Sequence, residues 1–82
     1  VSRSVGGYIP EGTIAKVLGE IQGDFPNTDI GSYPFLREGK LGTTLVVRGE
    51  NADEVNQASE RIRTTITDQG RDVIEDTGEV SA

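Results

Sequence analysis

Hydrophobic and polar residues alternate at the start of the chain. Val1, Arg3 and Val5 fall on one face of residues 1–8 and serines fall on the other, which is the period of a β-strand. Two consecutive glycines follow. This pattern predicts a short strand that runs into a turn.

A helix is predicted after this strand. Pro10-Glu11-Gly12-Thr13 is typical of a helix start, because proline fits the first turn and an acidic side chain is favoured at the positive end of the helix dipole. Hydrophobic residues then recur at helical spacing, at Ile14, Val17, Leu18, Ile21 and Phe25. They form one buried stripe, and Gly23 and Pro26 predict the end of the helix.

Two strands joined by a hairpin are predicted in the middle of the chain. Residues 43–48 (TTLVVR) are rich in β-branched side chains, and residues 29–36 precede them across a short loop at residues 37–42. Pro34 lies within the first of these strands. Because proline cannot donate a backbone hydrogen bond to a neighbouring strand, we expect that strand to lie at a sheet edge or to carry a bulge.

A second helix is predicted from Asn51, a capping residue that is followed three positions later by glutamate. Hydrophobic residues at helical spacing continue it, namely Val55, Ala58, Ile62 and Ile66. The helix is expected to end near Gly70. Residues 71–76 are a candidate last strand, and residues 77–82 are predicted to be a disordered tail.

The predicted order is β-α-β-β-α, with a further β if residues 71–76 form a strand. It predicts an α+β fold, a two-layer α/β sandwich with two helices on one face of a small mixed or antiparallel sheet. With 82 residues, 33% of them hydrophobic, we expect one domain over residues 1–76 with a thin core. Because the chain opens with Val1 rather than Met, we expect it to be excised from a longer protein.

The composition excludes several kinds of site. Without Cys or His, the chain has no thiolate nucleophile, no imidazole base and no thiolate or imidazole metal ligand. Its acidic residues do not follow the spacing of an EF-hand loop, so no metal site is predicted. No apolar run is long enough to span a membrane. We therefore expect a cytoplasmic domain that is not an enzyme by itself.

The net charge of −6 is unevenly distributed. Residues 1–49 hold five basic and five acidic residues, whereas residues 50–82 hold three basic and nine acidic residues. The second half therefore carries the whole excess of negative charge. Since such a surface repels a phosphate backbone, broad nucleic-acid binding is disfavoured, and an anion site is expected in the first half.

One dense stretch resembles a known family. Residues 25–35 (FPNTDIGSYPF) and 42–49 (GTTLVVRG), with the opening Ser2-Arg3-Ser4-Val5 and the Pro10-Glu11-Gly12 helix start, carry the likeness. The chain is similar over roughly residues 1–67 to the C-terminal, KH-type α/β domain of molybdopterin-binding-domain proteins of the CinA-like and FAD-synthase-like group.

The resemblance implies a parent protein with a molybdopterin-binding-type domain upstream of this one. In such parents that domain is tied to nucleotide pyrophosphate hydrolysis or pterin handling, so the parent is expected to use molybdopterin or a nucleotide with Mg²⁺. The present domain is then an accessory domain without a cofactor of its own. It would pack on the catalytic domain, or on a second subunit in a homo-oligomer, and help to shape or close the nucleotide or pterin site.

Candidate binding residues lie in the first half. In Gly31-Ser32-Tyr33-Pro34, glycine allows close backbone approach, Ser32 and Tyr33 offer hydroxyls, and the tyrosine ring can stack on a base. The basic candidates are Arg3, Arg37 and Lys40, with Arg48 as a further strand-end cation. In the structural interpretation, which we favour, the glycine and proline mark a bulge or bend and the charges are solvated strand ends.

A nucleic-acid-binding function is the alternative hypothesis. Gly39-Lys40-Leu41-Gly42 matches the GxxG loop of KH modules, but that loop joins two helices, whereas this one is predicted between two strands. The match is therefore interpreted as chance. The acidic residues Asp53, Glu54 and Glu60 of the second predicted helix are interpreted as a solvated face rather than paired catalytic carboxylates.

Overall fold

The computed structural model describes residues 1–81, which form four strands and two helices. Their order along the chain is β1 (Ser2–Gly7), α1 (Glu11–Asp24), β2 (Thr28–Arg37), β3 (Lys40–Gly49), α2 (Ala52–Asp68) and β4 (Val73–Asp76). The predicted β-α-β-β-α order is therefore confirmed, and residues 73–76 form the additional strand.

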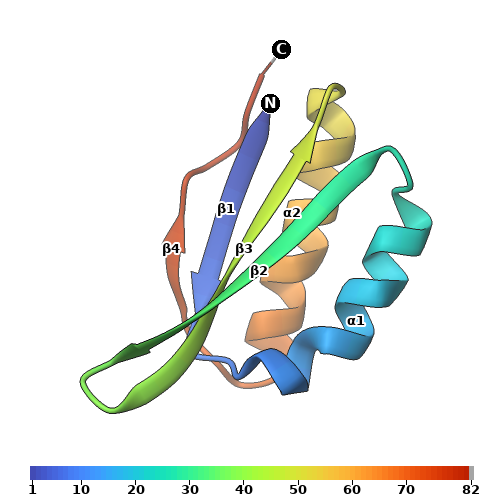
Figure 1. Ribbon diagram of the computed structural model, residues 1–82. Coiled ribbons are helices and arrows are strands. Elements are labelled where there is room, and N and C mark those ends of the chain that lie inside the picture. The colour runs from blue at the N-terminus through green and yellow to red at the C-terminus, as the bar shows by residue number, and fades with distance from the viewer. Residues whose placement is uncertain (82) are drawn as a thin grey trace.

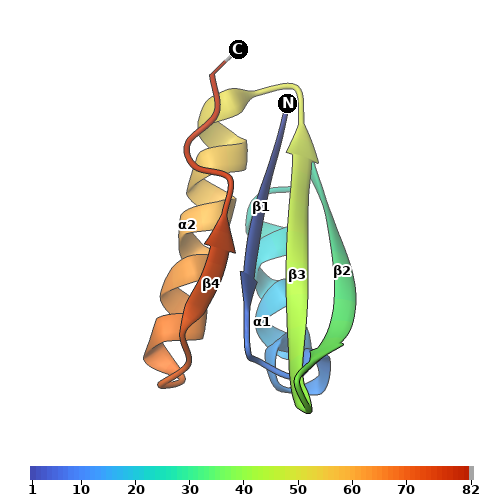
Figure 2. The same ribbon diagram turned by 90° about the vertical axis from the view of Figure 1, so that its left-hand side faces the viewer.

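All four strands belong to one antiparallel sheet with the spatial order β2-β3-β1-β4. Both helices lie on the same face of this sheet, and the other face carries no helix (Figure 1, Figure 2). This is the split β-α-β arrangement, and it confirms the predicted two-layer α+β fold. The face without helices is called the open face below, and the opposite one the helix side.

The hydrophobic core lies between the helices and the sheet. Ten aliphatic side chains are fully buried there: Val5, Ile9, Ile14, Ile21, Leu45, Val47, Val55, Ala58, Ile62 and Ile66. Most of the predicted helix stripe residues belong to this set, while Val17, Leu18 and Phe25 pack partly buried against it. Because the core is aliphatic and small, each of these side chains contributes a large share of the stability.

The β2–β3 hairpin is tighter than predicted. The two strands extend to Arg37 and Lys40, so that only Glu38 and Gly39 form the turn, with φ angles of 50° and 80°. Two consecutive positive φ values are typical of a type I′ turn, whose twist matches that of the flanking strands. The predicted loop over residues 37–42 is therefore wrong, because residues 37 and 40–42 continue the strands.

β2 is an edge strand, as its internal Pro34 predicts, and its pairing with β3 runs from Thr28 to Arg37 without a bulge. On the free edge, the side-chain amide of Gln22 in α1 donates to Thr28 O and accepts from Ile30 N at 3.2 Å. Because alternate residues of a strand direct their backbone groups to the same edge, Pro34 also turns its missing donor outward. Gln22 therefore occupies the start of this free edge, and Pro34 removes one backbone donor further along it, which makes regular pairing with another strand less favourable.

Residues 77–81, for which disorder is predicted, run along the body of the domain after β4. Thr77 N donates to Ser4 O at 3.0 Å, and Asn56 exchanges two hydrogen bonds with the backbone of Val80. Ala82 lies outside the described residues. These contacts fasten the segment to β1 and α2.

Candidate functional site

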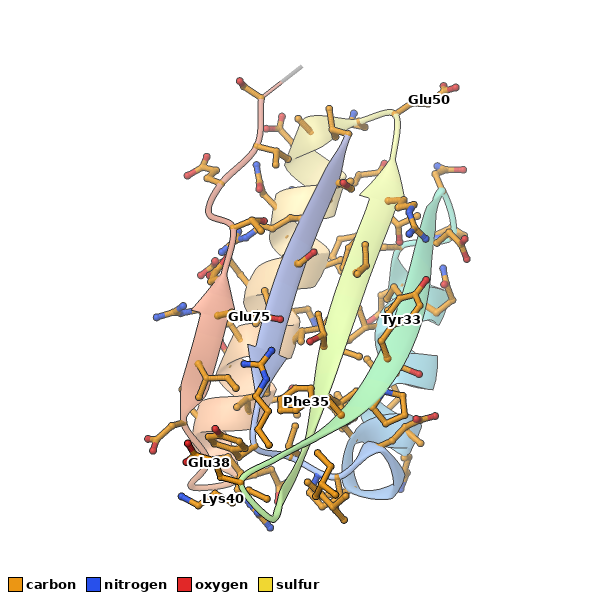
Figure 3. All side chains as sticks on the ribbon, turned by 60° about the vertical axis from the view of Figure 1, so that its left-hand side comes forward. Tyr33, Phe35, Glu38, Lys40, Glu50 and Glu75 are labelled. Carbon is orange, nitrogen blue, oxygen red and sulfur yellow. The ribbon has the colours of Figure 1, made fainter. Side chains whose placement is uncertain are left out.

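The open face combines small residues with two aromatic rings. By the strand register, Tyr33 pairs with Thr44 and Phe35 pairs with Gly42, and these residues alternate with the buried helix-side residues such as Leu45. Figure 3 shows Tyr33, Phe35 and Glu75 together on this face. Tyr33 is 50% exposed, an unusual position for a large ring on a strand without a covering layer.

Glycines explain how the two rings lie flat on the sheet. A β-carbon on Gly31 would lie 3.1 Å from the Tyr33 ring, and one on Gly42 would lie 2.3 Å from Phe35 Cζ and 2.7 Å from Gly7 O. The ring of Phe35 therefore occupies the space that a side chain at residue 42 would need. This arrangement, in which an aromatic ring covers a strand glycine, fixes the rings against the backbone and leaves their outer faces accessible.

An aromatic–cation cluster, made of Tyr8, Phe35, Arg37 and Lys40, lies at the hairpin end of the open face. The rings of Tyr8 and Phe35 meet edge to face with centroids 6.0 Å apart. The Arg37 guanidinium lies 4.5 Å from the centre of the Phe35 ring, and Lys40 Nζ lies 5.3 Å from that of Tyr8. These distances are suited to cation–π attraction.

Glu75 of β4 borders this cluster. It accepts a hydrogen bond from Thr44 Oγ1 at 2.7 Å and lies 3.8 Å from Arg37. Both side chains of that ion pair are substantially exposed, so the pair contributes little to stability. Around this cluster the open face therefore offers two positive charges and three aromatic rings, with the Glu75 carboxylate beside them, while Asp29 and Arg48 lie opposite each other in register further along the same face.

The structure brings together three of the five predicted site residues. Tyr33, Arg37 and Lys40 lie on the open face. Ser32 pairs with Leu45 and so lies on the helix side. Arg3 also lies on the helix side and is only 4% exposed.

The guanidinium of Arg3 is bound by the carboxylates of Glu60 and Asp76, and these three side chains are called the clasp below. Its Nε and Nη2 donate to the two carboxylate oxygens of Asp76 at 3.0 and 2.9 Å, and Nη2 also contacts Glu60. Arg63 adds a hydrogen bond to Asp76 at 3.0 Å. The hydrogen bond from Arg3, supported by Gly78 N–H and by nearby positive charge, holds the pKa of Asp76 at about 2, although burial opposes this shift.

The same clasp holds the pKa of Arg3 above its ordinary value, mainly through the hydrogen bond to Asp76. Its geometry ties β1, α2 and β4 together. The alternation of residues 1–5 already places Arg3 on the apolar face of its strand, but its acceptors lie 57 and 73 residues away in the sequence. Only the folded topology identifies Glu60 and Asp76 as those acceptors.

The GxxG sequence lies in the β2–β3 hairpin, between two strands, as predicted. Gly39 forms the turn, while Gly42 is buried under Phe35 within β3. Its four residues therefore do not form a free loop between helices. Within residues 1–81, no three acidic side chains are positioned to hold a metal ion, and no helix is long and apolar enough to cross a membrane.

Comparison with known proteins identifies the family. The family model described as FAD synthase, middle domain, matches residues 1–73. Neither the curated proteins nor the solved structures contain a match to this chain. The FAD-synthase-like part of the resemblance is thus confirmed, and the CinA-like and KH-type part stays a prediction. The chain belongs to the FAD synthase middle domain family.

Proposed function

We propose that this chain is an accessory domain of a larger, FAD-synthase-like protein, without catalytic activity by itself. It packs its open face against the neighbouring nucleotide- or pterin-handling domain of the same polypeptide. There it borders the bound ligand with Tyr33, Arg37 and Lys40. The observation that carries this proposal is the set of aromatic rings held flat and accessible on a sheet face that no helix covers.

The family description supports a neighbouring domain as the occupant of this face. A middle domain is by its name flanked by others within one protein. The first residue and the last described residues lie at the same end of the sheet (Figure 1, Figure 2), the latter beside the start of α2. A neighbour joined there can lie along the sheet without a long connection. The small side chains on the face, such as Ser4 and Thr44, allow such a surface to approach closely.

The spacing of rings and charges favours an elongated anionic ligand at the edge of that contact. Tyr33 and Arg37 are four residues apart on β2, which corresponds to roughly 13 Å at about 3.3 Å per residue. A planar ring system stacked on Tyr33 would then have its phosphates near Arg37 and Lys40. A free pterin or base is too short to reach both, so a nucleotide with its phosphates fits better.

Kinetics of the full-length protein test this proposal. We expect Tyr33→Ala to raise KM for the nucleotide substrate by about tenfold while kcat changes little, because the lost stacking stabilises ground state and transition state alike. The combined change Arg37→Ala with Lys40→Ala should raise KM by a similar factor and reduce its dependence on salt.

Lys16→Ala is a matched control, since Lys16 is exposed on α1, on the other side of the molecule. The docking itself is measured by hydrogen exchange. Amides of β2 and β3 should exchange more slowly in the full-length protein than in the 82-residue chain. Equal exchange in both, together with unchanged KM in the Tyr33 variant, would overturn the proposal.

A further inference from the structure

The side chain of Glu75 lies across the open face of the sheet (Figure 3). Glu75 belongs to β4, an edge strand, and its carboxylate accepts the 2.7 Å hydrogen bond from Thr44 Oγ1 on β3, two strands away. It also comes within 3.8 Å of Arg37 on β2, the opposite edge strand. The side chain of Glu75 therefore brings a negative charge from β4 to the aromatic–cation cluster.

A glycine in the intervening strand makes this path possible. Gly6 of β1 pairs with Glu75 on one side and with Thr44 on the other. A β-carbon on Gly6 would lie 2.9 Å from Glu75 Cγ and 3.0 Å from Glu75 Oε1, so a larger residue there would displace the carboxylate. Glycine within a strand often marks the close approach of another group. Here that group is the carboxylate of Glu75.

The groups around this carboxylate are those that bind an oxyanion. A threonine hydroxyl donates to it and a guanidinium lies beside it, and the same cluster holds Lys40, which forms no ion pair within residues 1–81. The distance of 3.8 Å to Arg37 is too long for a hydrogen bond, and the two side chains are 51% and 38% exposed. Glu75 is thus held weakly and makes no hydrogen bond with the guanidinium.

We propose that Thr44 and Arg37 form a phosphate-binding site that the Glu75 carboxylate occupies in the free domain and that a ligand phosphate takes over by displacing it. This inference rests on the proposed function, because it concerns a ligand on the same face. A phosphate group carries up to about two negative charges and three acceptor oxygens, so it can bind the hydroxyl and the guanidinium at once. Glu75 then lowers the affinity for the ligand, because it has to leave before the phosphate binds.

Titration of the 82-residue chain with inorganic pyrophosphate, at constant ionic strength, tests this inference. The Kd is obtained from the NMR shifts of the Arg37 and Thr44 amides. Glu75→Ala should lower this Kd about tenfold, because the site is then vacant. Asp29→Ala is the matched control, since it removes the same charge from the same face at eight residues from Arg37 along β2, roughly 26 Å at about 3.3 Å per residue. It should change Kd by less than about twofold, because the distance exceeds the Debye length.

Thr44→Val separates displacement from simple charge repulsion. In the unaltered chain this change removes a donor both from the ligand and from Glu75, so Kd should change little. In the Glu75→Ala chain only the ligand loses the donor, and Kd should rise at least about threefold. An equal rise in both chains would overturn the inference, because Glu75 would then act through its charge alone.

Two further results would overturn the inference. One is a Kd that is the same with and without Glu75, and the other is a Glu75→Ala chain in which pyrophosphate shifts neither amide. Neither result changes the KM of the full-length Tyr33 variant, which reports on the proposed function alone. The failure of this inference and the failure of the proposed function are therefore distinguishable.

Discussion

On the helix side of the sheet, Leu45 and Val47 are fully buried, whereas Val46 between them faces the open side and is partly exposed. The helix side pairs its one buried cation, Arg3, with two carboxylates, while the open face leaves Lys40 above a ring. The two faces therefore share the same strands but differ in the burial and pairing of their side chains. The difference teaches that the helix side carries most of the packing on which folding depends, whereas the open face leaves more of its side chains exposed.

The change with the largest expected effect on stability removes one core side chain. Ile62→Ala should lower the free energy of unfolding by about 2–5 kcal/mol, because Ile62 is fully buried between α2 and the sheet. Val46→Ala on the open face should cost less than about 1 kcal/mol by the same urea titration. Similar losses for the two variants would contradict the division between the faces.

Breaking the clasp should have the next largest effect. Asp76→Asn should cost roughly 3 kcal/mol, because it leaves the Arg3 guanidinium buried with Glu60 as its remaining carboxylate partner. Arg3→Met combined with Asp76→Leu should recover most of that loss, since apolar replacements remove the buried charge as well. Thermal unfolding of the single and double variants measures this. A double variant no more stable than the single one would refute the explanation.

The clasp also predicts an acid-sensitive stability. The pKa of Asp76 is about 2 in the folded domain, below the value of about 3.9 that is usual for an unfolded chain. The resulting stabilisation, about 2 kcal/mol, is present above about pH 4 and is lost as the pH falls from 4 towards 2. Denaturant titrations across this range should show the loss in the unaltered chain. If Asp76→Asn shows the same slope, another group is responsible.

The glycines beneath the aromatic rings give a smaller and graded effect. Gly42→Ala should cost about 1–2 kcal/mol, because its β-carbon meets both Phe35 and the backbone oxygen of Gly7. Gly31→Ala should cost less, since only the exposed Tyr33 ring has to move. Equal costs would show that the backbone, and not the ring, sets the requirement for glycine.

Replacing the exposed ring of Tyr33 should have the smallest effect on stability. Tyr33→Ser should change the stability of the isolated chain by no more than about 0.5 kcal/mol, the range usual for surface positions. The same change should be costly only in the full-length protein, where the open face is proposed to be covered. A large loss in the isolated chain would make Tyr33 part of the fold rather than of a contact surface.

The elements could be predicted from local signals, and the partners of side chains could not. Asn51 caps α2 as predicted, with its side chain accepting a hydrogen bond from Glu54 N, and Pro34 correctly indicates an edge strand. Each of these residues affects backbone hydrogen bonds only within a few residues of its own position. The sequence predicts Arg3 as a candidate anion-binding residue, whereas its guanidinium is bound by Glu60 of α2 and Asp76 of β4. Because these acceptors lie far along the chain, nothing local distinguishes a paired arginine from a free one.

The open-face residues show the same limit. Strand alternation separates Ser32 from Tyr33, because neighbouring residues point to opposite faces. The cluster of Tyr8 and Phe35 with two cations, however, depends on the register between β2 and β3 and on the placement of β1 beside β3. Such register is set by the whole sheet, so the sequence provides the residues but not their assembly.

The clasp on Arg3 also bears on where this domain can be cut from its surroundings. The family match ends at residue 73, whereas the carboxylate that neutralises Arg3 belongs to residue 76 and the last backbone contacts reach Val80. A fragment trimmed to the matched region would deprive the guanidinium at the centre of the sheet of its main counter-ion. The charge of Arg3 therefore extends the module at least to Asp76, and we expect a fragment that ends at residue 73 to be less stable than one that also keeps the contacts of Val80.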